Sequence, residues 1–372
     1  VHHQYLPPGR TLFQGVAQLP PGHYLLAERG QRKVERYWSL DFPRQPATTA
    51  PPEELEEQLA ARLDEAVRLR LRADVPLGAY LSGGLDSSLV AALASRHSPR
   101  PLPCFCISFA HAPYDERHAA ERVARHLDAP LHLVELSQDR LLELLPEAVT
   151  MSEGLAIGGQ LPAKLALARA AREAGVKAVL VGEGADELLG GYPHLLMDFR
   201  RAAGLSACSH GDTISSGVMV PSARAPHLPQ VVALLGAVPS FLSAKAAFGA
   251  TLAELLRPEV RETWAKRDPF AALLAEVGVE ANLEGRHPVD QAAWLWSQLA
   301  LGRYILETLG DGTEMAASLE GRVPFLDHTV AELCCQIPVE QKIRPVESAH
   351  DGDELMAKAV LRNVAKPLLP TE

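Results

Sequence analysis

The spacing of hydrophobic residues predicts one long helix followed by an alternation of short strands and helices. Leu55, Leu59, Leu63, Val67 and Leu71 recur every four residues with Glu and Arg between them, which is typical of an amphipathic helix that begins near residue 53. Shorter apolar runs then alternate with Ala- and Leu-rich runs. Strands are expected at 75–81, 102–109, 131–135 and 177–181, and helices at 86–95, 115–127, 137–149 and 162–174. This alternation predicts an α/β fold with a doubly wound parallel sheet.

The regions on either side of this alternation have a different character. Residues 1–42 hold short strand-like runs and Pro-Pro-Gly turns, and they are too few to close a core of their own. Residues 43–52 are rich in Pro, Thr and Ala and are expected to be a linker. Beyond residue 192 a mostly helical C-terminal half is expected, with a surface loop at 204–229 and helices at 231–242, 270–277, 289–309, 329–336 and 354–364.

Composition narrows the class of protein. The 372 residues are 47% hydrophobic, enough for a substantial core, and the net charge of −10 argues against a nucleic-acid binder. No apolar run approaches the length of a membrane span, and the first residues do not form a signal peptide. The five cysteines include no CxxC pair, and the fourteen histidines are scattered. We therefore expect a protein of the reducing cytoplasm.

The stretch LSGGLDSS at 81–88 lies between an expected strand and an expected helix. Its two glycines allow a tight turn, and the N–H groups at the helix start can hold an anion. Three serines in the stretch add hydroxyl donors. Asp86 would repel a phosphate unless a divalent cation lay between them. Leu85 stands where a Walker loop has Lys. The stretch thus predicts a different kind of site for a nucleoside triphosphate with Mg²⁺.

A second polar stretch, GEGADE at 182–187, follows the last expected strand. Its three carboxylates would repel one another if they were buried without a metal, a shared proton or solvent. A solvated acidic turn is the competing interpretation. Because ligands of doubly wound sheets bind at the carboxyl ends of the strands, we favour a site there. Asp186 could share Mg²⁺ with Asp86, and Glu183 could accept a proton from an attacking nucleophile.

Two cations further along the chain are candidates to meet a departing pyrophosphate. Arg322 lies in an expected charged turn, EGRVPFLD at 320–327, and Lys358 lies in an expected helical stretch at 355–361. From the residues alone, each is more simply a surface or structural charge.

Taken together, the motifs resemble the glutamine-hydrolysing asparagine synthetase family, and SGGxDS resembles the PP-loop of ATP pyrophosphatases. The matching motifs occur in the family's order over roughly residues 55–372: SGGLDSS, ISF at 107–109, YDE at 114–116, GEGADELLGGY, EGRVPFLDH and KAVLR. The resemblance implies a PP-loop fold and an ATP-dependent amide-forming ligase. Such an enzyme adenylates a carboxylate, in the first instance aspartate, and transfers ammonia to give the amide, AMP and pyrophosphate.

The resemblance also implies roles for individual residues. The pyrophosphate loop would be Ser82, Gly83, Gly84, Asp86, Ser87 and Ser88. The remaining ATP site would include Leu81, Ile107, Ser108 and Gly182. The Mg²⁺ ligands would be Asp86 and Asp186, and the catalytic set would be Glu183, Lys358 and Arg322.

Residues 5–42 resemble the last strands of the family's N-terminal glutaminase domain. The nucleophilic Cys of that domain has no counterpart before Cys104. The expected organisation is a glutaminase remnant at 1–42, a linker at 43–52 and the synthetase domain at 53–372. A glutaminase domain or subunit is the expected partner, a homodimer is a candidate assembly, and ammonium is the expected nitrogen source.

Several departures from the family leave the acid substrate open. They lie at 152–159, at Val181 and at 311–315, where Asp-Gly-Thr-Glu-Met replaces a basic variant. One alternative is an amidotransferase of specialised metabolism that acts on another carboxylic acid. A second is a β-lactam synthetase-like cyclase, disfavoured because that group carries Tyr in place of Glu183. A third is a non-enzymatic relative, made less favourable by the retained acidic and basic site residues.

Overall fold

The computed structural model describes residues 6–7, 9–44, 48, 50–109, 115–153, 158–205, 226–265, 269–279, 283–346 and 354–370. The chain forms two units. Unit 1 comprises Val1–Thr49, Glu187–Arg303 and Cys335–Lys358, and unit 2 comprises Ala50–Asp186, Tyr304–Cys334 and Ala359–Glu372.

Unit 2 is built on a five-stranded parallel sheet. Its strands are β3 (Leu77–Tyr80), β4 (Cys104–Phe109), β5 (Leu131–Leu136), β6 (Ala178–Leu180) and β7 (Glu320–Arg322), in the spatial order β5-β4-β3-β6-β7. The chain passes from β3 outward to β5 and then returns to β6 on the other side of β3. This reversal is the switch point of a doubly wound sheet and confirms the predicted α/β fold.

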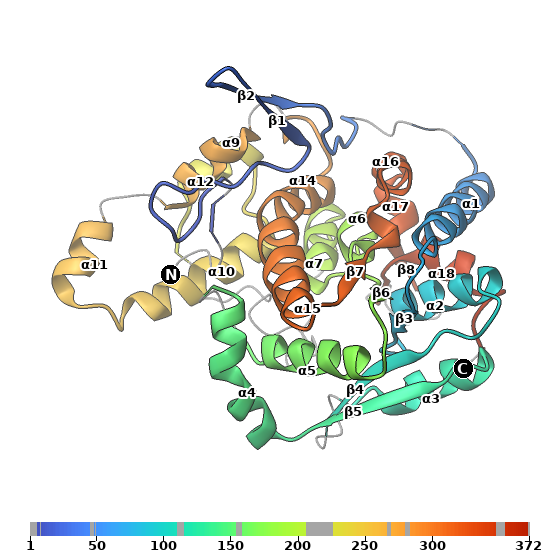
Figure 1. Ribbon diagram of the computed structural model, residues 1–372. Coiled ribbons are helices and arrows are strands. Elements are labelled where there is room, and N and C mark those ends of the chain that lie inside the picture. Colours follow the sequence, from blue (N-terminus) through green and yellow to red (C-terminus); the bar gives the residue numbers. More distant parts are fainter. Residues whose placement is uncertain are drawn as a thin grey trace. The chain divides into compact units, whose positions relative to one another are not determined.

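Helices cover both faces of this sheet, as right-handed crossovers in opposite directions require. Helices α2 (Leu85–His97) and α3 (Arg117–His126) connect β3, β4 and β5, whereas α5 (Gln160–Glu173) precedes β6 and packs on β4 and β5 from the other side (Figure 1). The remaining helices with residues in unit 2 are α1 (Pro52–Arg70), α4 (Gln138–Met151), α6 (Ala185–Leu189), η3 (Ser297–Asp311), α15 (Gly312–Ala316), η4 (Pro324–Leu326), α16 (His328–Gln336) and α18 (Ala359–Ala365).

The periodic helix α1 buries the stripe that its sequence predicts. Leu59, Leu63 and Val67 are fully buried, and the helix packs against α2 and α18. Glu53 and Glu54 lie in its first turn, and Arg68 and Arg70 lie in its last turn, which suits the helix dipole at both ends.

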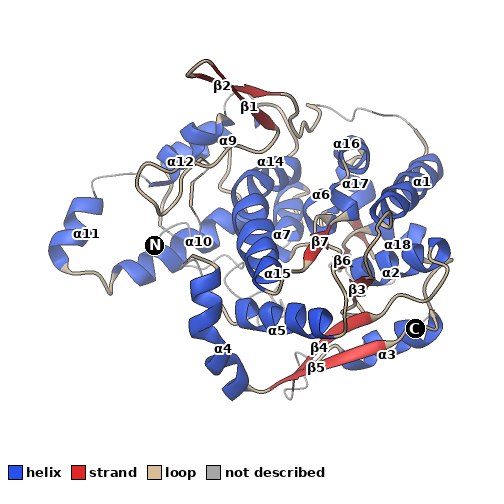
Figure 2. Cartoon of the chain, in the orientation of Figure 1, coloured by secondary structure: helices blue, strands red, loops and turns tan. Residues whose placement is uncertain are grey.

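Unit 1 is mostly helical (Figure 2). It holds α7 (Pro193–Ala202), α9 (Pro229–Leu235), α10 (Ser240–Ala253), α11 (Pro258–Ala265), α12 (Pro269–Val277), α14 (Pro288–Trp296), α17 (Val339–Lys342), the short pair β8 (Arg344–Pro345) and β9 (Leu355–Met356), and the hairpin of β1 (His23–Glu28) and β2 (Gln31–Arg36). The segment after the hairpin is anchored on α14, because Trp294 Nε1 donates a hydrogen bond to the Leu40 carbonyl at 3.2 Å and Phe42 is fully buried.

Three predicted elements differ from the structure. The helix predicted at 231–242 is divided, because Gly236 takes the left-handed C-cap of α9 (φ 77°) and α10 begins only after Pro239. The helix predicted to hold Lys358 is wrong in its first part: β9 pairs with β8, Lys358 lies in a left-handed turn (φ 53°), and α18 begins at Ala359. The turn predicted at 320–322 is the edge strand β7.

Among helices formed by the described residues, none has the length and apolarity needed to cross a membrane. Cys104, Cys106, Cys334 and Cys335 are buried. Of the loop predicted at 204–229, residues 206–225 lie outside the described residues.

The buried stripe of α1 makes a direct stability prediction. We expect Leu63→Ala to lower the free energy of unfolding by about 2–5 kcal/mol, because Leu63 is fully buried and its truncation leaves a cavity. Leu69→Ala, on the exposed side of the same helix, should cost about 1 kcal/mol or less. Urea unfolding followed by circular dichroism measures both; equal losses would contradict the assigned stripe.

Candidate active site

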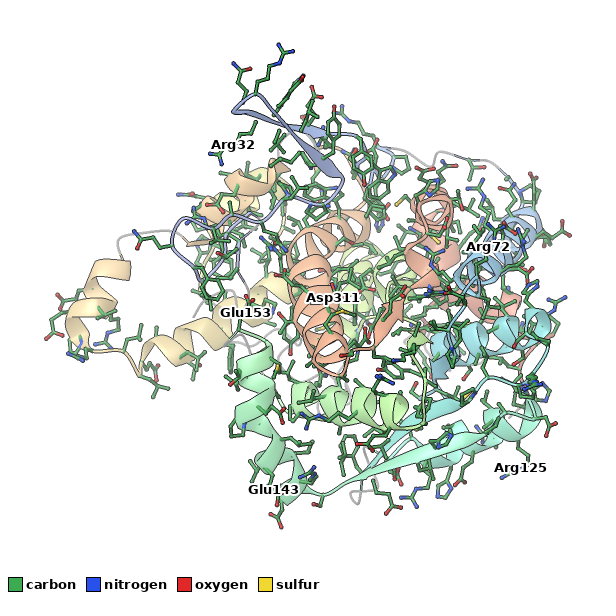
Figure 3. All side chains as sticks on the ribbon, viewed as in Figure 1. Arg32, Arg72, Arg125, Glu143, Glu153 and Asp311 are labelled. Carbon is green, nitrogen blue, oxygen red and sulfur yellow. The ribbon has the colours of Figure 1, made fainter. Side chains whose placement is uncertain are left out.

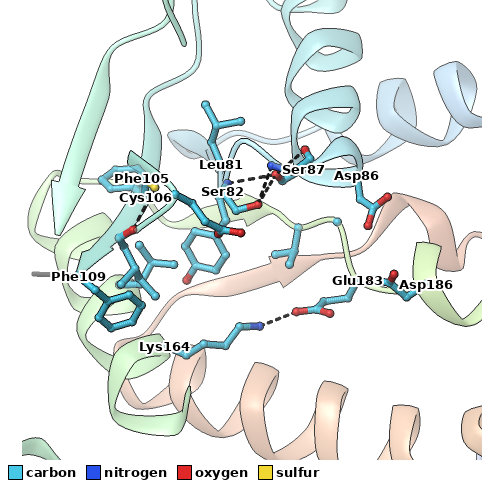
Figure 4. Close-up of a pocket in the computed structure, with 17 residues that line it drawn as sticks. Leu81, Ser82, Asp86, Ser87, Phe105, Cys106, Phe109, Lys164, Glu183 and Asp186 are labelled. Carbon is cyan, nitrogen blue, oxygen red and sulfur yellow. Dashed lines mark hydrogen bonds and ion pairs between the residues drawn. The ribbon is translucent and has the colours of Figure 1, made fainter. Parts of the chain in front are cut away.

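A cavity of about 300 Å³ lies at the carboxyl ends of β3 and β6, and we call it the strand-end cavity (Figure 4). The structure brings most of the predicted ATP and metal residues to its wall: Leu81, Ser82, Gly84, Asp86, Ser87, Ile107, Gly182, Glu183 and Asp186. The two polar stretches at 81–88 and 182–187 therefore contribute to the wall of the same cavity.

The loop between β3 and α2 is held in shape by its own serines. The N–H of Ser82 donates to Ser87 Oγ at 3.1 Å, the two hydroxyl oxygens lie 3.0 Å apart, and the N–H of Gly84 donates to Ser82 Oγ at 3.1 Å. Gly83 has φ +79°, and an added Cβ would lie 2.5 Å from the Ala119 backbone. Because α2 begins directly after this loop, the cavity meets a helix N-terminus, which favours an anion such as a phosphate.

Residues 182–187 after β6, which we call the acidic loop, lie against residues 81–88, which we call the phosphate loop. A Cβ added to Gly182 would lie 3.0 Å from the Ser87 nitrogen and 3.2 Å from the Cβ of Asp86. The side chains of Asp86 and Asp186 point toward one another at the same end of the cavity (Figure 4).

This arrangement fits a hard divalent cation that also binds phosphate. Carboxylate oxygens are the ligands that Mg²⁺ prefers, usually one or two from the protein beside water and phosphate oxygens. No group of three or more His, Cys, Asp or Glu that could hold a metal alone is found among the described residues. Asp86 and Asp186 would therefore share the ion with the nucleotide.

Glu183 is held by a lysine that sequence reasoning missed. Lys164 Nζ donates to Glu183 Oε1 at 2.8 Å, and both side chains are largely buried (Figure 4). Lys164 follows the buried Leu161 by three residues and precedes the buried Ala168 by four, so it shares their face of α5. A lysine on the apolar face of a predicted helix is the signal that could have identified it.

The other wall of the strand-end cavity is aromatic and aliphatic. It includes Phe105, Cys106 and Phe109 from β4, and Tyr80 from the end of β3. Burial raises the pKa of the Cys106 thiol to about 12, so this cysteine is neutral and packs as an apolar group. The buried hydroxyl of Tyr80 has no hydrogen-bond partner among the described residues. The wall is suited to a flat, apolar ligand group.

Three predicted ATP residues are not among those that line the cavity. Gly83 provides the turn, and Ser88 is buried in α2. The Ser108 hydroxyl donates to Asp115 at 3.1 Å and accepts from Arg117 Nε at 2.9 Å.

The two predicted phosphate cations have other surroundings. The Arg322 guanidinium donates to the carbonyls of Arg70 and Arg72 at 2.6 and 3.1 Å and pairs with Glu320 at 2.8 Å. The structure thus does not bring Arg322 to the strand-end cavity. Lys358 belongs to unit 1 and is not assigned to this cavity.

A second cavity of about 190 Å³, which we call the side cavity, shares Lys164, Val181 and Glu183 with the first. Its wall also includes two acids. Asp311 lies where η3 ends and α15 begins (Figure 3), and Glu314 lies within α15 with only 3% of its surface exposed. Burial raises the pKa of Glu314 to about 7; Lys164 lowers it, and the charges of Asp311 and Glu183 raise it further.

The raised pKa of Glu314 predicts a pH-dependent stability. The ordinary pKa is 4.5, so between about pH 4.5 and 7 the folded protein binds more protons than the unfolded chain. Stability therefore falls as the pH rises through this window. In Glu314→Gln this loss is absent. The free energy of unfolding of the variant, relative to the wild type, should therefore rise by up to about 3 kcal/mol between pH 5 and 8. Urea unfolding at several pH values tests this, with the exposed Glu173→Gln as the control. A constant difference between E314Q and wild type would contradict the prediction.

The family model for asparagine synthase matches residues 58–372. The chain belongs to this family. The match confirms the resemblance of the synthetase region that the motifs indicate.

Individual relatives support the same assignment. The amidase chyE of Penicillium rubens is 30% identical over 405 aligned residues, which cover 98% of this chain and 58% of that protein. A putative glutamine-hydrolyzing asparagine synthetase of Mycobacterium tuberculosis is 31% identical over 374 aligned residues, which cover 99% of this chain and 54% of that protein. The chain thus spans a little over half the length of these asparagine synthase family members. The U34-tRNA thiolase NcsA of Methanococcus maripaludis has a TM-score of 0.30 at 15% identity, covering 66% of this chain and 79% of that one; a score this low adds nothing to the assignment.

Proposed function

We propose that the protein is a carboxylate–ammonia ligase that adenylates a carboxylic acid with ATP and then transfers ammonia to the acyl group. The observation that carries the proposal is the meeting of the phosphate loop and the acidic loop in one strand-end cavity. Membership of the asparagine synthase family supports an ATP-dependent amide ligase.

In the first step, an oxygen of the acid's carboxylate attacks the α-phosphorus of ATP. The bond to the bridging oxygen breaks, and pyrophosphate leaves with the electron pair. The helix-start N–H groups of α2 and the hydroxyls of Ser82 and Ser87 would hold the charge that develops on pyrophosphate. Mg²⁺ bound at Asp86 and Asp186 would further neutralise the triphosphate.

In the second step, ammonia attacks the acyl carbon, and AMP leaves as the amide forms. The nitrogen then carries a surplus proton, and Glu183, which lines the strand-end cavity, would accept it. Lys164 fixes the orientation of Glu183 through their ion pair. From the family resemblance, Lys358 would steady the phosphates. For Arg322 we propose an indirect role, because its guanidinium secures the end of α1.

Because the chain belongs to the asparagine synthase family, aspartate is the first acid to test. Membership of the family does not by itself identify the acid substrate. One relative above is named an amidase and the other an asparagine synthetase. A glutaminase domain or subunit is the proposed partner for nitrogen supply. The exposed apolar side chains Tyr24, Leu25, Leu26 and Val34 of the β1–β2 hairpin are compatible with such a neighbour.

The proposed metal ligands can be tested by pyrophosphate exchange. We expect Asp86→Asn and Asp186→Asn each to lower Mg²⁺-dependent exchange between ATP and labelled pyrophosphate by about 10²-fold or more, because charge on the triphosphate is no longer neutralised. The exposed Asp139→Asn serves as the matched control. Exchange that persists in both variants at ordinary Mg²⁺ concentrations would remove these aspartates from the site.

The nitrogen source gives a second test. A purified polypeptide of this sequence, supplied with ATP, Mg²⁺ and an accepted acid, should release AMP with ammonium but not with glutamine, because no Cys precedes Cys104 to attack glutamine. AMP, pyrophosphate and amide are measured together. Turnover with glutamine alone would show that the interpretation of residues 1–42 is wrong.

A further inference from the structure

The side cavity and the strand-end cavity share part of their walls, including one ion pair. Lys164, Val181 and Glu183 line both cavities, so a molecule in the side cavity would reach the same ion pair that faces the strand-end cavity. The side cavity is the smaller of the two, at about 190 Å³ against 300 Å³. It is suited to a small acid rather than to a nucleotide.

Glu314 is a buried carboxyl group in the wall of this cavity. Only 3% of its surface is exposed, and its side chain lines the cavity beside Gly321. A buried carboxyl group is costly to leave without a hydrogen-bond partner, and on a cavity wall a ligand can supply one.

Gly321 in β7 makes room for this carboxyl group. A Cβ added at Gly321 would overlap Oε2 of Glu314 and lie 2.8 Å from its carboxyl carbon. Gly321 does not have the left-handed backbone conformation that favours glycine. The glycine is therefore required for space, and Glu314 and Gly321 form a matched pair.

The charges on the wall favour a nitrogen donor over a second carboxylate. Glu183, Asp311 and Glu314 are acids, and among the described lining residues the one Lys or Arg is Lys164, which pairs with Glu183 at 2.8 Å. A second carboxylate on the acceptor would meet two further acids without a cation of its own. An ammonium group would instead donate to Glu314 and favour its ionised form, which gives a charge-assisted hydrogen bond.

We propose that Glu314, with Asp311, is a specificity-determining residue that selects a small carboxylic acid bearing an amine or other N–H group and no second carboxylate. The inference rests on the proposed function, because the side cavity holds the acceptor only if the strand-end cavity holds ATP. It distinguishes this chain from an enzyme specific for aspartate, whose second carboxylate the cavity disfavours.

Two matched series of acids test the proposal. The first is 3-aminopropanoate, propanoate, succinate and aspartate; the second is 4-aminobutanoate, butanoate, glutarate and glutamate. Within each series the acids differ only in the amine and the second carboxylate. The readout is acid-dependent exchange of pyrophosphate with ATP, and ATP–Mg²⁺ binding is measured separately by thermal shift.

In the wild type, the amino acid without a second carboxylate should give the highest kcat/KM in at least one series. In Glu314→Gln its preference over the unsubstituted acid should fall by about tenfold or more, while exchange with the unsubstituted acid is retained. Gly321→Ala, which displaces the same carboxyl group, should reduce the preference in the same direction. The exposed Glu173→Gln should leave it unchanged.

The failures are distinguishable. Exchange that is highest with the dicarboxylic acids, or a preference unaffected by E314Q, would overturn the role of Glu314 and leave the ligase proposal standing. Exchange with none of the eight acids while ATP–Mg²⁺ still binds would overturn the assignment of the side cavity to such acceptors. Loss of ATP–Mg²⁺ binding in the wild type would overturn the proposed function itself.

Discussion

The site depends on the adjacency of two strand ends in a parallel sheet. β3 and β6 are hydrogen-bonded neighbours, in register from Leu77 and Ala178 to Ala79 and Leu180. Both strands end at the same edge, so the segments that follow them lie so close that a Cβ at position 182 would be 3.0 Å from the Ser87 nitrogen. This contact holds the phosphate loop and the acidic loop in one geometry before a ligand arrives. Such preorganisation is what an electrostatically demanding transition state requires.

The Lys164–Glu183 ion pair connects the two cavities that this geometry creates. It lies on the wall of both, and its members come from different elements, α5 and the loop after β6. A carboxylate that is paired with a lysine keeps one orientation. A fixed orientation suits a group that would accept a proton at the junction of the two cavities. Because Lys164 is paired with Glu183, the remaining acids Glu314 and Asp311 make the wall of the side cavity acidic.

The sequence pattern predicted correctly those features of the structure that depend on residues close together in the chain. The stripe of α1, the alternation of strands and helices, and the Gly and Ser residues of the phosphate loop depend on near neighbours in the chain, and the structure has them as expected. The helix predicted around Lys358 is wrong in its first part, because Leu355 and Met356 pair with β8, and the pattern of residues 355–361 does not reveal that partner. Arg322 had the chemistry of a phosphate ligand but is engaged by carbonyl groups at the end of α1.

By itself, the sequence determined the fold class, the family and the two polar stretches for which phosphate and metal chemistry is proposed, because each depends on short runs of residues. Only the tertiary structure decided that Lys164 faces Glu183, that Gly83, Ser88 and Ser108 do not line the strand-end cavity, and that Gly321 leaves room for Glu314. These facts depend on strand order and on which helix face meets the sheet. Since both result from packing between distant segments, no local pattern specifies them.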